Sequence, residues 1–153
     1  ENISKNLTRY YDGGSPTALW AVRSRGIDPA TGQEIFVKKD GTLTYTFDYK
    51  DEVEVGDSRP TLEGVWGNTF YYKGWSASLQ LRYSFGADVF NSTLFNKVEN
   101  ISSRSITTNQ DRRALYNRWK KPGDKAKFKS ISLTESTPMS SRFVMKENYL
   151  SIE

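Results

Sequence analysis

The sequence predicts an all-β fold built from antiparallel strands. The main observation is residues 62–85, in which apolar and polar side chains alternate on both sides of a Lys-Gly pair. A second is the Asp40-Gly41 pair between two short runs of strand-forming residues, a strong hairpin signal. No apolar run approaches about eighteen residues, so the sequence excludes a transmembrane helix.

The elements that precede residues 62–85 are short. Residues 34–39 and 42–47 flank the Asp40-Gly41 turn and are predicted to pair as antiparallel strands. The others follow in chain order: a turn cluster at residues 12–16, a strand at 18–24, a loop at 26–32 and a polar connection at 50–60.

Residues 62–85 are predicted to form one long hairpin that turns at Lys73-Gly74. Glycine adopts positive φ without steric cost, and two-residue loops are the commonest hairpin connections. Folding here separates apolar from polar side chains in the same register on both arms. The apolar face then holds Leu62, Trp66, Phe70, Tyr72, Trp75, Leu79, Leu81, Tyr83 and Phe85, and the polar face includes Glu63, Gln80 and Arg82.

The hairpin has the dimensions of a transmembrane one. Each arm covers about eleven residues, close to the roughly 9–11 that a tilted strand needs to cross a bilayer. Aromatic residues crowd its turn, as in the interfacial girdle of an outer-membrane barrel. We therefore expect the apolar face to contact lipid, and Glu63, Gln80 and Arg82 to face the lumen of a large antiparallel β-barrel. A hairpin of a soluble β-sandwich would show the same alternation, so this alternative stays open.

The composition offers little for catalysis. The 153 residues contain neither Cys nor His, which removes the usual zinc ligands and the usual general base. The chain has no Gly-rich phosphate loop and no nucleophile elbow. The acidic residues between 48 and 57 lack the spacing of a calcium loop. We therefore predict no catalytic residue, no metal site and no cofactor.

Charge is divided unevenly along the chain. Residues 1–90 carry ten Lys or Arg and twelve Asp or Glu, whereas residues 91–153 carry twelve and six. The basic residues of the second part are dispersed around Pro122-Gly123, and no nucleic-acid-binding motif organises them. We interpret them as a solvated loop and predict no nucleic acid partner.

Residues 86–140 show no sustained period and are predicted to form a long loop. Within it, residues 109–119 are predicted to form a helix with Asn109 as its N-cap, and residues 142–152 predict a further strand. A connection of this length is unusual in a compact soluble domain but ordinary on the outer side of an outer-membrane barrel.

Four segments of the chain also occur, in this order, in one family of proteins. They are residues 26–32 (Gly-Ile-Asp-Pro-Ala-Thr-Gly), the stretch from Arg59-Pro60 through the turn at 72–75, residues 118–124 (Arg-Trp-Lys-Lys-Pro-Gly-Asp) and residues 141–150. The succession covers about 130 of the 153 residues. It resembles the C-terminal part of SusC/RagA-type TonB-dependent transporters of Bacteroidetes outer membranes.

The resemblance implies a fold and a function. Members of this family form a barrel of about 22 strands around a plug, and they import glycans or oligopeptides beneath a SusD-like surface lipoprotein, driven by TonB. By this resemblance, residues 1–61 supply strands and an extracellular loop, 62–85 a transmembrane hairpin, 86–140 an extracellular loop and 141–153 the start of the next strand. No reaction is implied.

The same resemblance implies several partners. No plug and no TonB-contacting segment is present in the sequence, so we expect the chain to be a segment of a longer transporter in outer-membrane lipid. Its partners would be the remaining barrel and plug, the lipoprotein, TonB and the substrate. We also expect the chain not to enclose a core by itself, because two or three strands leave unpaired edges.

Three loop residues are the candidates for binding. If Lys73-Gly74 is a periplasmic turn, residues 86–140 lie outside the cell, where Tyr116, Arg118 and Trp119 are the residue types that carry binding energy in protein interfaces. Packing within the loop is the alternative for these side chains. The alternative for the whole chain is a soluble β-sandwich that binds carbohydrate through Trp119 and its neighbours.

Overall fold

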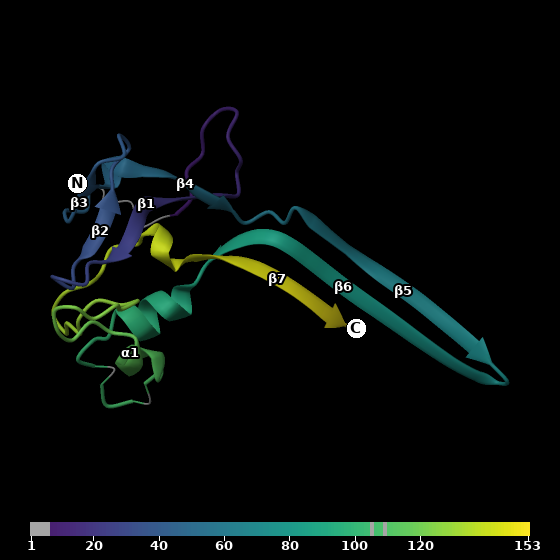
Figure 1. Cartoon of the computed structure of the whole chain (residues 1–153). Helices are drawn as coiled ribbons and strands as arrows, with labels where there is room; N and C mark the ends of the chain where they lie inside the picture. Colours follow the sequence, from purple (N-terminus) through teal and green to yellow (C-terminus); the bar gives the residue numbers. More distant parts are fainter. Residues whose placement is uncertain (1–6, 105, 109) are drawn as a thin grey trace.

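The computed structural model describes residues 7–104, 106–108 and 110–153, and it confirms the predicted all-β fold. The strands form two antiparallel sheets, one of four strands and one of three. Figure 1 shows that the three-stranded sheet projects from the rest of the molecule. We call this sheet the arm, and residues 7–61 with 91–143 the head.

The head is organised by a four-stranded sheet with the order β3-β2-β1-β4. Its strands are β1 (Ala18–Ile27), β2 (Glu34–Val37), β3 (Leu43–Thr44) and β4 (Glu52–Asp57). The hairpin predicted at Asp40-Gly41 is confirmed, although its strands β2 and β3 are shorter than expected. Gly41 has a φ of 86°, which explains why glycine occupies this turn.

The prediction of a polar connection at residues 50–60 is wrong, because strand β4 (Glu52–Asp57) lies within this segment. This strand pairs with β1, opposite the edge of β1 that β2 occupies. The acidic Glu52 at its start is buried and forms an ion pair with Arg9. Local composition therefore misled the prediction: the charge of Glu52 is balanced by a residue about forty positions away, which no local pattern reveals.

The arm consists of β5 (Leu62–Tyr72), β6 (Trp75–Phe90) and β7 (Val144–Ile152), in the order β5-β6-β7. All eleven predicted β5–β6 pairs are confirmed, from Leu62 opposite Phe85 to Tyr72 opposite Trp75. Lys73 and Gly74 both have positive φ, at 44° and 86°, as the type I′ turn requires. Strand β7 confirms the strand predicted at residues 142–152, except that Arg142 and Phe143 belong to a short helical turn and the strand begins at Val144.

Strand β6 is longer than predicted, since it continues to Phe90. The alternation of apolar and polar residues breaks because the β6–β7 register shifts between Ser84 and Ala87. Gly86 lies in this bulge with a φ of 88°, and its amide donates to Oδ1 of Asn148. One extra residue exchanges the two faces of the strand, so a period-2 pattern could not extend across it.

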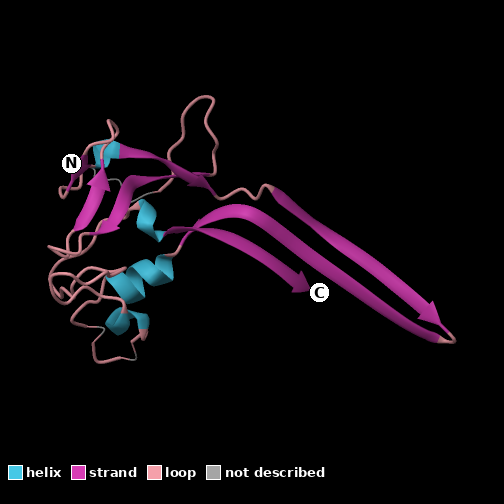
Figure 2. Cartoon of the chain, viewed as in Figure 1, coloured by secondary structure: helices cyan, strands magenta, loops and turns pink. Residues whose placement is uncertain are grey.

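The helical segments are short and lie in the head (Figure 2). They are η1 (Tyr49–Asp51), the π-helix η2 (Leu94–Glu99), α1 (Arg113–Tyr116) and η3 (Ser141–Phe143). The helix predicted over residues 109–119 is therefore wrong in extent, and its proposed cap, Asn109, lies outside the described residues. The Asp111 carboxylate accepts the amide of Arg113 instead, and the helix ends after one turn.

The head encloses a core of its own, which contradicts the prediction that the chain would not. Phe143, Val22 and Val98 are fully buried. Phe143 makes edge-on contacts with Phe90 and Phe95, with ring centroids 6.0 and 5.1 Å away. The isolated bridge between Val22 and Ser140 joins the head sheet to the segment that leads into β7.

We expect the hairpin turn to tolerate asparagine better than its native lysine. Among the residues that the structure describes, Lys73 is the non-glycine residue with a positive φ. Asparagine adopts this conformation more readily than lysine does. Lys73→Asn should raise the free energy of unfolding by up to about 1 kcal/mol, whereas Lys73→Val should lower it. Denaturant unfolding of the variants in one detergent measures the difference, and a Val variant as stable as the Asn variant would contradict the argument.

Candidate functional site

The arm presents one continuous apolar face across its three strands. Trp66, Leu81 and Ile152 are direct cross-strand neighbours and therefore lie on the same face. Tyr83 pairs with Leu150 on β7 and lies over Gly64 on β5, where an added Cβ would be 2.5 Å from its hydroxyl oxygen. The predicted residues Leu62, Trp66, Phe70, Tyr72, Trp75, Leu79, Leu81, Tyr83 and Phe85 share this face.

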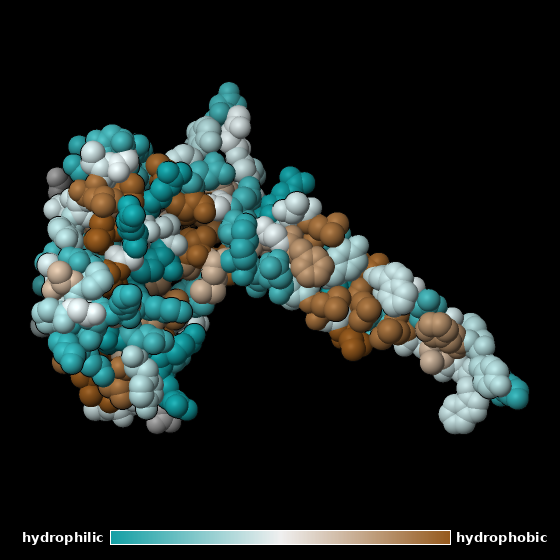
Figure 3. All heavy atoms as spheres, viewed as in Figure 1, coloured by the Kyte–Doolittle hydropathy of each residue, from teal (hydrophilic) through white to brown (hydrophobic). Residues whose placement is uncertain are grey.

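This apolar face is uncovered. Its aromatic residues near the turn are among the most exposed in the chain, with Trp75 at 81% and Tyr72 at 70%. Figure 3 shows hydrophobic side chains along the visible side of the arm. Monomeric soluble proteins rarely leave a contiguous apolar surface of this kind open to water, so such a face marks contact with a partner or a membrane.

The opposite face of the arm is mainly polar, although Val65 and Tyr71 also lie on it. Glu63, Gln80 and Arg82 alternate with the apolar set and lie together on this face. The Arg82 guanidinium donates from Nε to Oε1 of Glu153 over 2.6 Å, which ties β6 to the residue after β7. The hydroxyl oxygens of Thr69 and Ser78 are 3.4 Å apart across the hairpin. The sequence thus correctly predicted which residues share each face.

Of the three candidate loop residues, Arg118 is buried and serves the loop itself. Its guanidinium donates to the carbonyl oxygens of Ala114, Lys129 and Glu99 over 2.6, 2.9 and 2.9 Å, and also to that of Val98. These four acceptors come from η2, α1 and the strand-like segment near Phe128. Arg118 therefore holds three loop segments together, which supports the packing alternative for this residue.

Trp119 and Tyr116 take different positions. The Trp119 indole donates to the carbonyl oxygen of Pro29 over 2.8 Å, and its ring packs on Gly32, where an added Cβ would lie 2.5 Å away. Trp119 thereby fastens the long loop to the β1–β2 connection. Tyr116 is 66% exposed and lies beneath the guanidinium of Arg112, so of the three it offers the most open surface.

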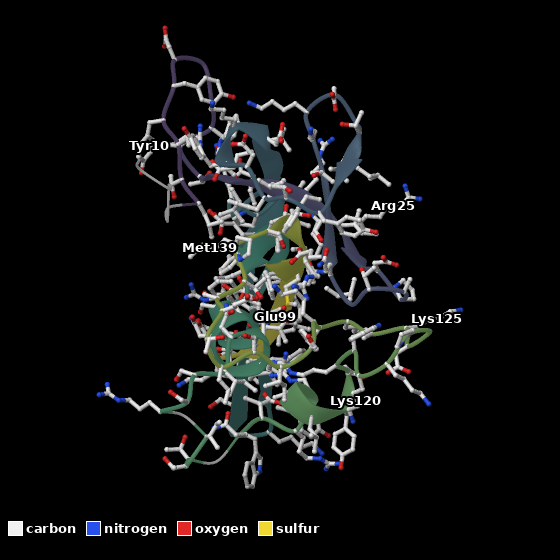
Figure 4. All side chains as sticks on the ribbon, turned by 90° about the vertical axis from the view of Figure 1, so that its left-hand side faces the viewer. Tyr10, Arg25, Glu99, Lys120, Lys125 and Met139 are labelled. Carbon is white, nitrogen blue, oxygen red and sulfur yellow. The ribbon has the colours of Figure 1, made fainter. Side chains whose placement is uncertain are left out.

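The principal feature missed by sequence reasoning is a buried charge network at the centre of the head. Arg142 donates from Nη2 to carboxylate oxygens of Glu34 and Glu99 over 3.0 and 2.9 Å, and from Nη1 to the carbonyl oxygen of Lys127 over 2.7 Å. Ser140 and Thr137 donate to the same two carboxylates. Figure 4 shows Glu99 in the middle of the head, between the sheet and the loops that carry Lys120 and Lys125.

The network brings opposite charges together in a buried region. Burial alone would lower the pKa of Arg142, but the hydrogen bonds and charges of Glu99 and Glu34 outweigh burial and raise it. Burial lowers the pKa of Arg118, against the opposing charge of Glu99. Two carboxylates and two guanidinium groups therefore share one buried region. A sequence offers one weak sign of this, an acidic residue at the start of the predicted strand 34–39.

The described residues contain no group of three or more carboxylates that could hold a metal ion. No helix among them is long and apolar enough to cross a membrane.

The chain matches no protein-family model and no curated protein. Solved structures do resemble it. It aligns with the RagAB peptide importer in the open-open state at a TM-score of 0.70 and 18% identity, covering 94% of this chain and 17% of that one. It aligns with the closed-closed state at a TM-score of 0.71 and 17% identity, covering 97% of this chain and 18% of that one. It aligns with a further structure of the RagAB peptide transporter at a TM-score of 0.68 and 19% identity, covering 90% of this chain and 16% of that one. At these identities the likeness shows the fold, and the chain spans about a sixth of the chains it matches.

We expect the charge network to be essential for the stability of the head. Glu99→Ala would leave Arg142 and Arg118 with an uncompensated buried charge, and loss of one partner of a buried pair costs roughly 3–5 kcal/mol. The exposed Glu147→Ala serves as the control and should change stability by less than about 0.5 kcal/mol. Denaturant unfolding followed by tryptophan fluorescence measures both. Equal effects of the two variants would exclude a structural role for the network.

Proposed function

We propose that the chain forms part of the wall and the external loops of an outer-membrane β-barrel importer. The observation that carries this proposal is the structure of the arm. Its hairpin pairs eleven residues of β5 with eleven of β6, and it has one uncovered apolar face and one mainly polar face. The fold shared with the RagAB importer chains supports it. On this proposal the apolar face contacts lipid, and Glu63, Gln80 and Arg82 face the lumen.

The soluble β-sandwich alternative fits the arm poorly. A sandwich buries one face of each sheet against the other, yet no described residue of β5 is buried. The arm also leaves the outer edges of β5 and β7 without partners among the described strands. In lipid each unpaired backbone group costs several kcal/mol, so the proposal requires further strands on both edges, supplied by the rest of the barrel.

The head then lies outside the cell, above the barrel wall. With Lys73-Gly74 as a periplasmic turn, the long loop and the β1–β4 sheet are on the extracellular side. We infer that a SusD-like surface lipoprotein contacts this head, that TonB drives transport through a plug contributed elsewhere, and that the cargo is a glycan or an oligopeptide. We assign no reaction to the chain.

The lipid-facing assignment is tested by introducing arginine at neighbouring positions of β6. Leu79→Arg places a charge on the apolar face, where the cost near the bilayer midplane is about 2–4 kcal/mol, whereas Gln80→Arg places it on the polar face at little cost. We expect Leu79→Arg to lower the folded fraction in lipid vesicles and Gln80→Arg to leave it unchanged. Mobility with and without heating on denaturing gels measures the folded fraction of the native protein that carries this chain.

The two positions are matched because they are adjacent on the same strand and receive the same side chain. A general effect of arginine on expression or folding would therefore appear in both variants. If Gln80→Arg blocked insertion and Leu79→Arg did not, the faces would be reversed. If neither variant blocked insertion, the arm would not contact lipid.

The contact with a lipoprotein is tested at Tyr116. This side chain is exposed, so Tyr116→Ala should reduce recovery of the partner by about tenfold without loss of stability, as truncation of an interface aromatic commonly does. Lys125→Ala, elsewhere on the same loop, is the control. Quantitative co-purification from native membranes measures recovery. Full recovery with Tyr116→Ala would remove this residue from the interface.

A further inference from the structure

The tip of the arm carries a single charge. Lys73 is the only charged residue between Glu63 and Arg82 in the sequence. Figure 1 shows the turn between β5 and β6 at the end of the arm that lies far from the head. Within the part of the chain that the structure describes, the Lys73 ammonium makes no ion pair. Its positive charge is therefore left for a group outside these residues.

The backbone of the turn does not explain why the residue is lysine. Lys73 has a φ of 44°, in the left-handed region that glycine and asparagine adopt more readily. Asparagine is also the residue preferred at this position of a type I′ turn. Residues held in sparsely populated backbone conformations often mark functional positions. The reason for lysine at the tip therefore lies in its side chain.

The side chain holds its charge on the apolar face of the arm. Nζ of Lys73 lies 5.2 Å from the centroid of the Tyr72 ring, a cation–π contact. Tyr72 belongs to the apolar face, and its cross-strand partner is Trp75. The two aromatic residues are 70% and 81% exposed. One ammonium and two open aromatic rings thus lie together at the end of this face.

The length of the arm places this group at a membrane surface. At a rise of about 3.3 Å per residue, the eleven residues of β5 extend about 36 Å along the strand. With a tilt of about 40° they cover roughly 28 Å of membrane thickness, close to the apolar band of about 25 Å of an outer-membrane barrel. If Leu62 lies at one boundary of the bilayer, Lys73 reaches the other. Aromatic rings and lysine ammonium groups at such a boundary lie among lipid headgroups.

We propose that Lys73, Tyr72 and Trp75 bind the phosphate of an anionic phospholipid in the periplasmic leaflet. The ammonium pairs with the phosphate as a point charge, and the two rings pack on the glycerol region of the same lipid. A zwitterionic headgroup compensates its phosphate with its own cation, whereas an anionic headgroup presents a net charge that attracts lysine. The inference rests on the proposed function in taking the apolar face as lipid-facing. It adds that lipid at this end of the arm is selected by its charge.

The test measures lipid binding at Trp75. The native protein that carries this chain is reconstituted in phosphatidylcholine vesicles that contain either brominated phosphatidylglycerol or brominated phosphatidylcholine. Bromine quenches nearby tryptophan, and the Trp75 signal is the fluorescence of each protein minus that of its Trp75→Phe variant. We expect roughly a fivefold preference for phosphatidylglycerol, the size of effect of one lysine at an anionic membrane surface. High salt should reduce this preference.

Variants of Lys73 separate its charge from its place in the turn. Lys73→Asn should abolish the preference and Lys73→Arg should retain it, because only the second keeps the charge. Asparagine suits the turn, and the folded fraction of each variant is measured by mobility with and without heating on denaturing gels. Lys125→Asn removes an exposed lysine from the head, serves as the matched control and should leave the preference unchanged.

Three results would overturn the proposal. They are a Lys73→Asn variant that keeps the preference, a wild-type protein that has none, and a preference that Lys125→Asn lowers as much as Lys73→Asn does. Inorganic phosphate, added at the ionic strength of a chloride control, should displace phosphatidylglycerol no more than chloride does. Stronger displacement by phosphate would assign the site to a soluble anion and would equally overturn the lipid assignment.

Failure here is distinguishable from failure of the proposed function. If Leu79→Arg blocks membrane insertion while both brominated lipids quench Trp75 equally, the arm contacts lipid and the phosphate site is wrong. If neither brominated lipid quenches Trp75 and both arginine variants insert, the lipid-facing assignment itself is wrong.

Discussion

The arrangement of this chain depends on the ion pairs and hydrogen bonds of the Arg142 guanidinium. The guanidinium binds Glu34 at the start of β2, Glu99 at the end of η2 and the carbonyl oxygen of Lys127. Arg142 itself lies in η3, immediately before β7. One side chain thus links the head sheet, the helical loop and the strand that enters the arm. Since its carboxylate partners are almost completely buried, the network can form only when all three segments are in place.

The neighbouring contacts follow from this arrangement. Phe143, the residue after Arg142, is fully buried against Phe90 of β6 and Phe95 of η2. The Ser24 amide donates to Oγ of Ser141 over 2.9 Å, which joins β1 to the same junction. Packing and hydrogen bonds in the head therefore help to position β7 beside β6, in addition to the pairing of the two strands along the arm.

The sequence predicted the arm far better than the head. Period-2 alternation and a Lys-Gly turn determine which side chains of residues 62–85 meet, and all eleven pairs are confirmed. The head depends instead on contacts between distant residues, such as Arg142 with Glu34 and Trp119 with Pro29. Neither contact leaves a local pattern. Arg118 and Trp119 stood out by residue type, yet residue type does not distinguish a surface contact from an internal one, and the structure uses both to pack the loop.

The two parts of the chain meet at the bulge of Gly86, where one strand changes its surroundings. Before the bulge, β6 alternates between an uncovered apolar face and a polar face; after it, Ala87 is buried and Asp88 accepts the Asp57 amide and pairs with Lys146. The head encloses a buried apolar core and pairs its buried Glu34 and Glu99 with Arg142. No residue of β5 is buried, and the buried residues of β6 are Ser84 and Ala87, so the apolar face of the hairpin is left to contact material outside the described residues. On the proposed assignment that material is lipid, and the extra residue at Gly86 marks the level at which the strand leaves it.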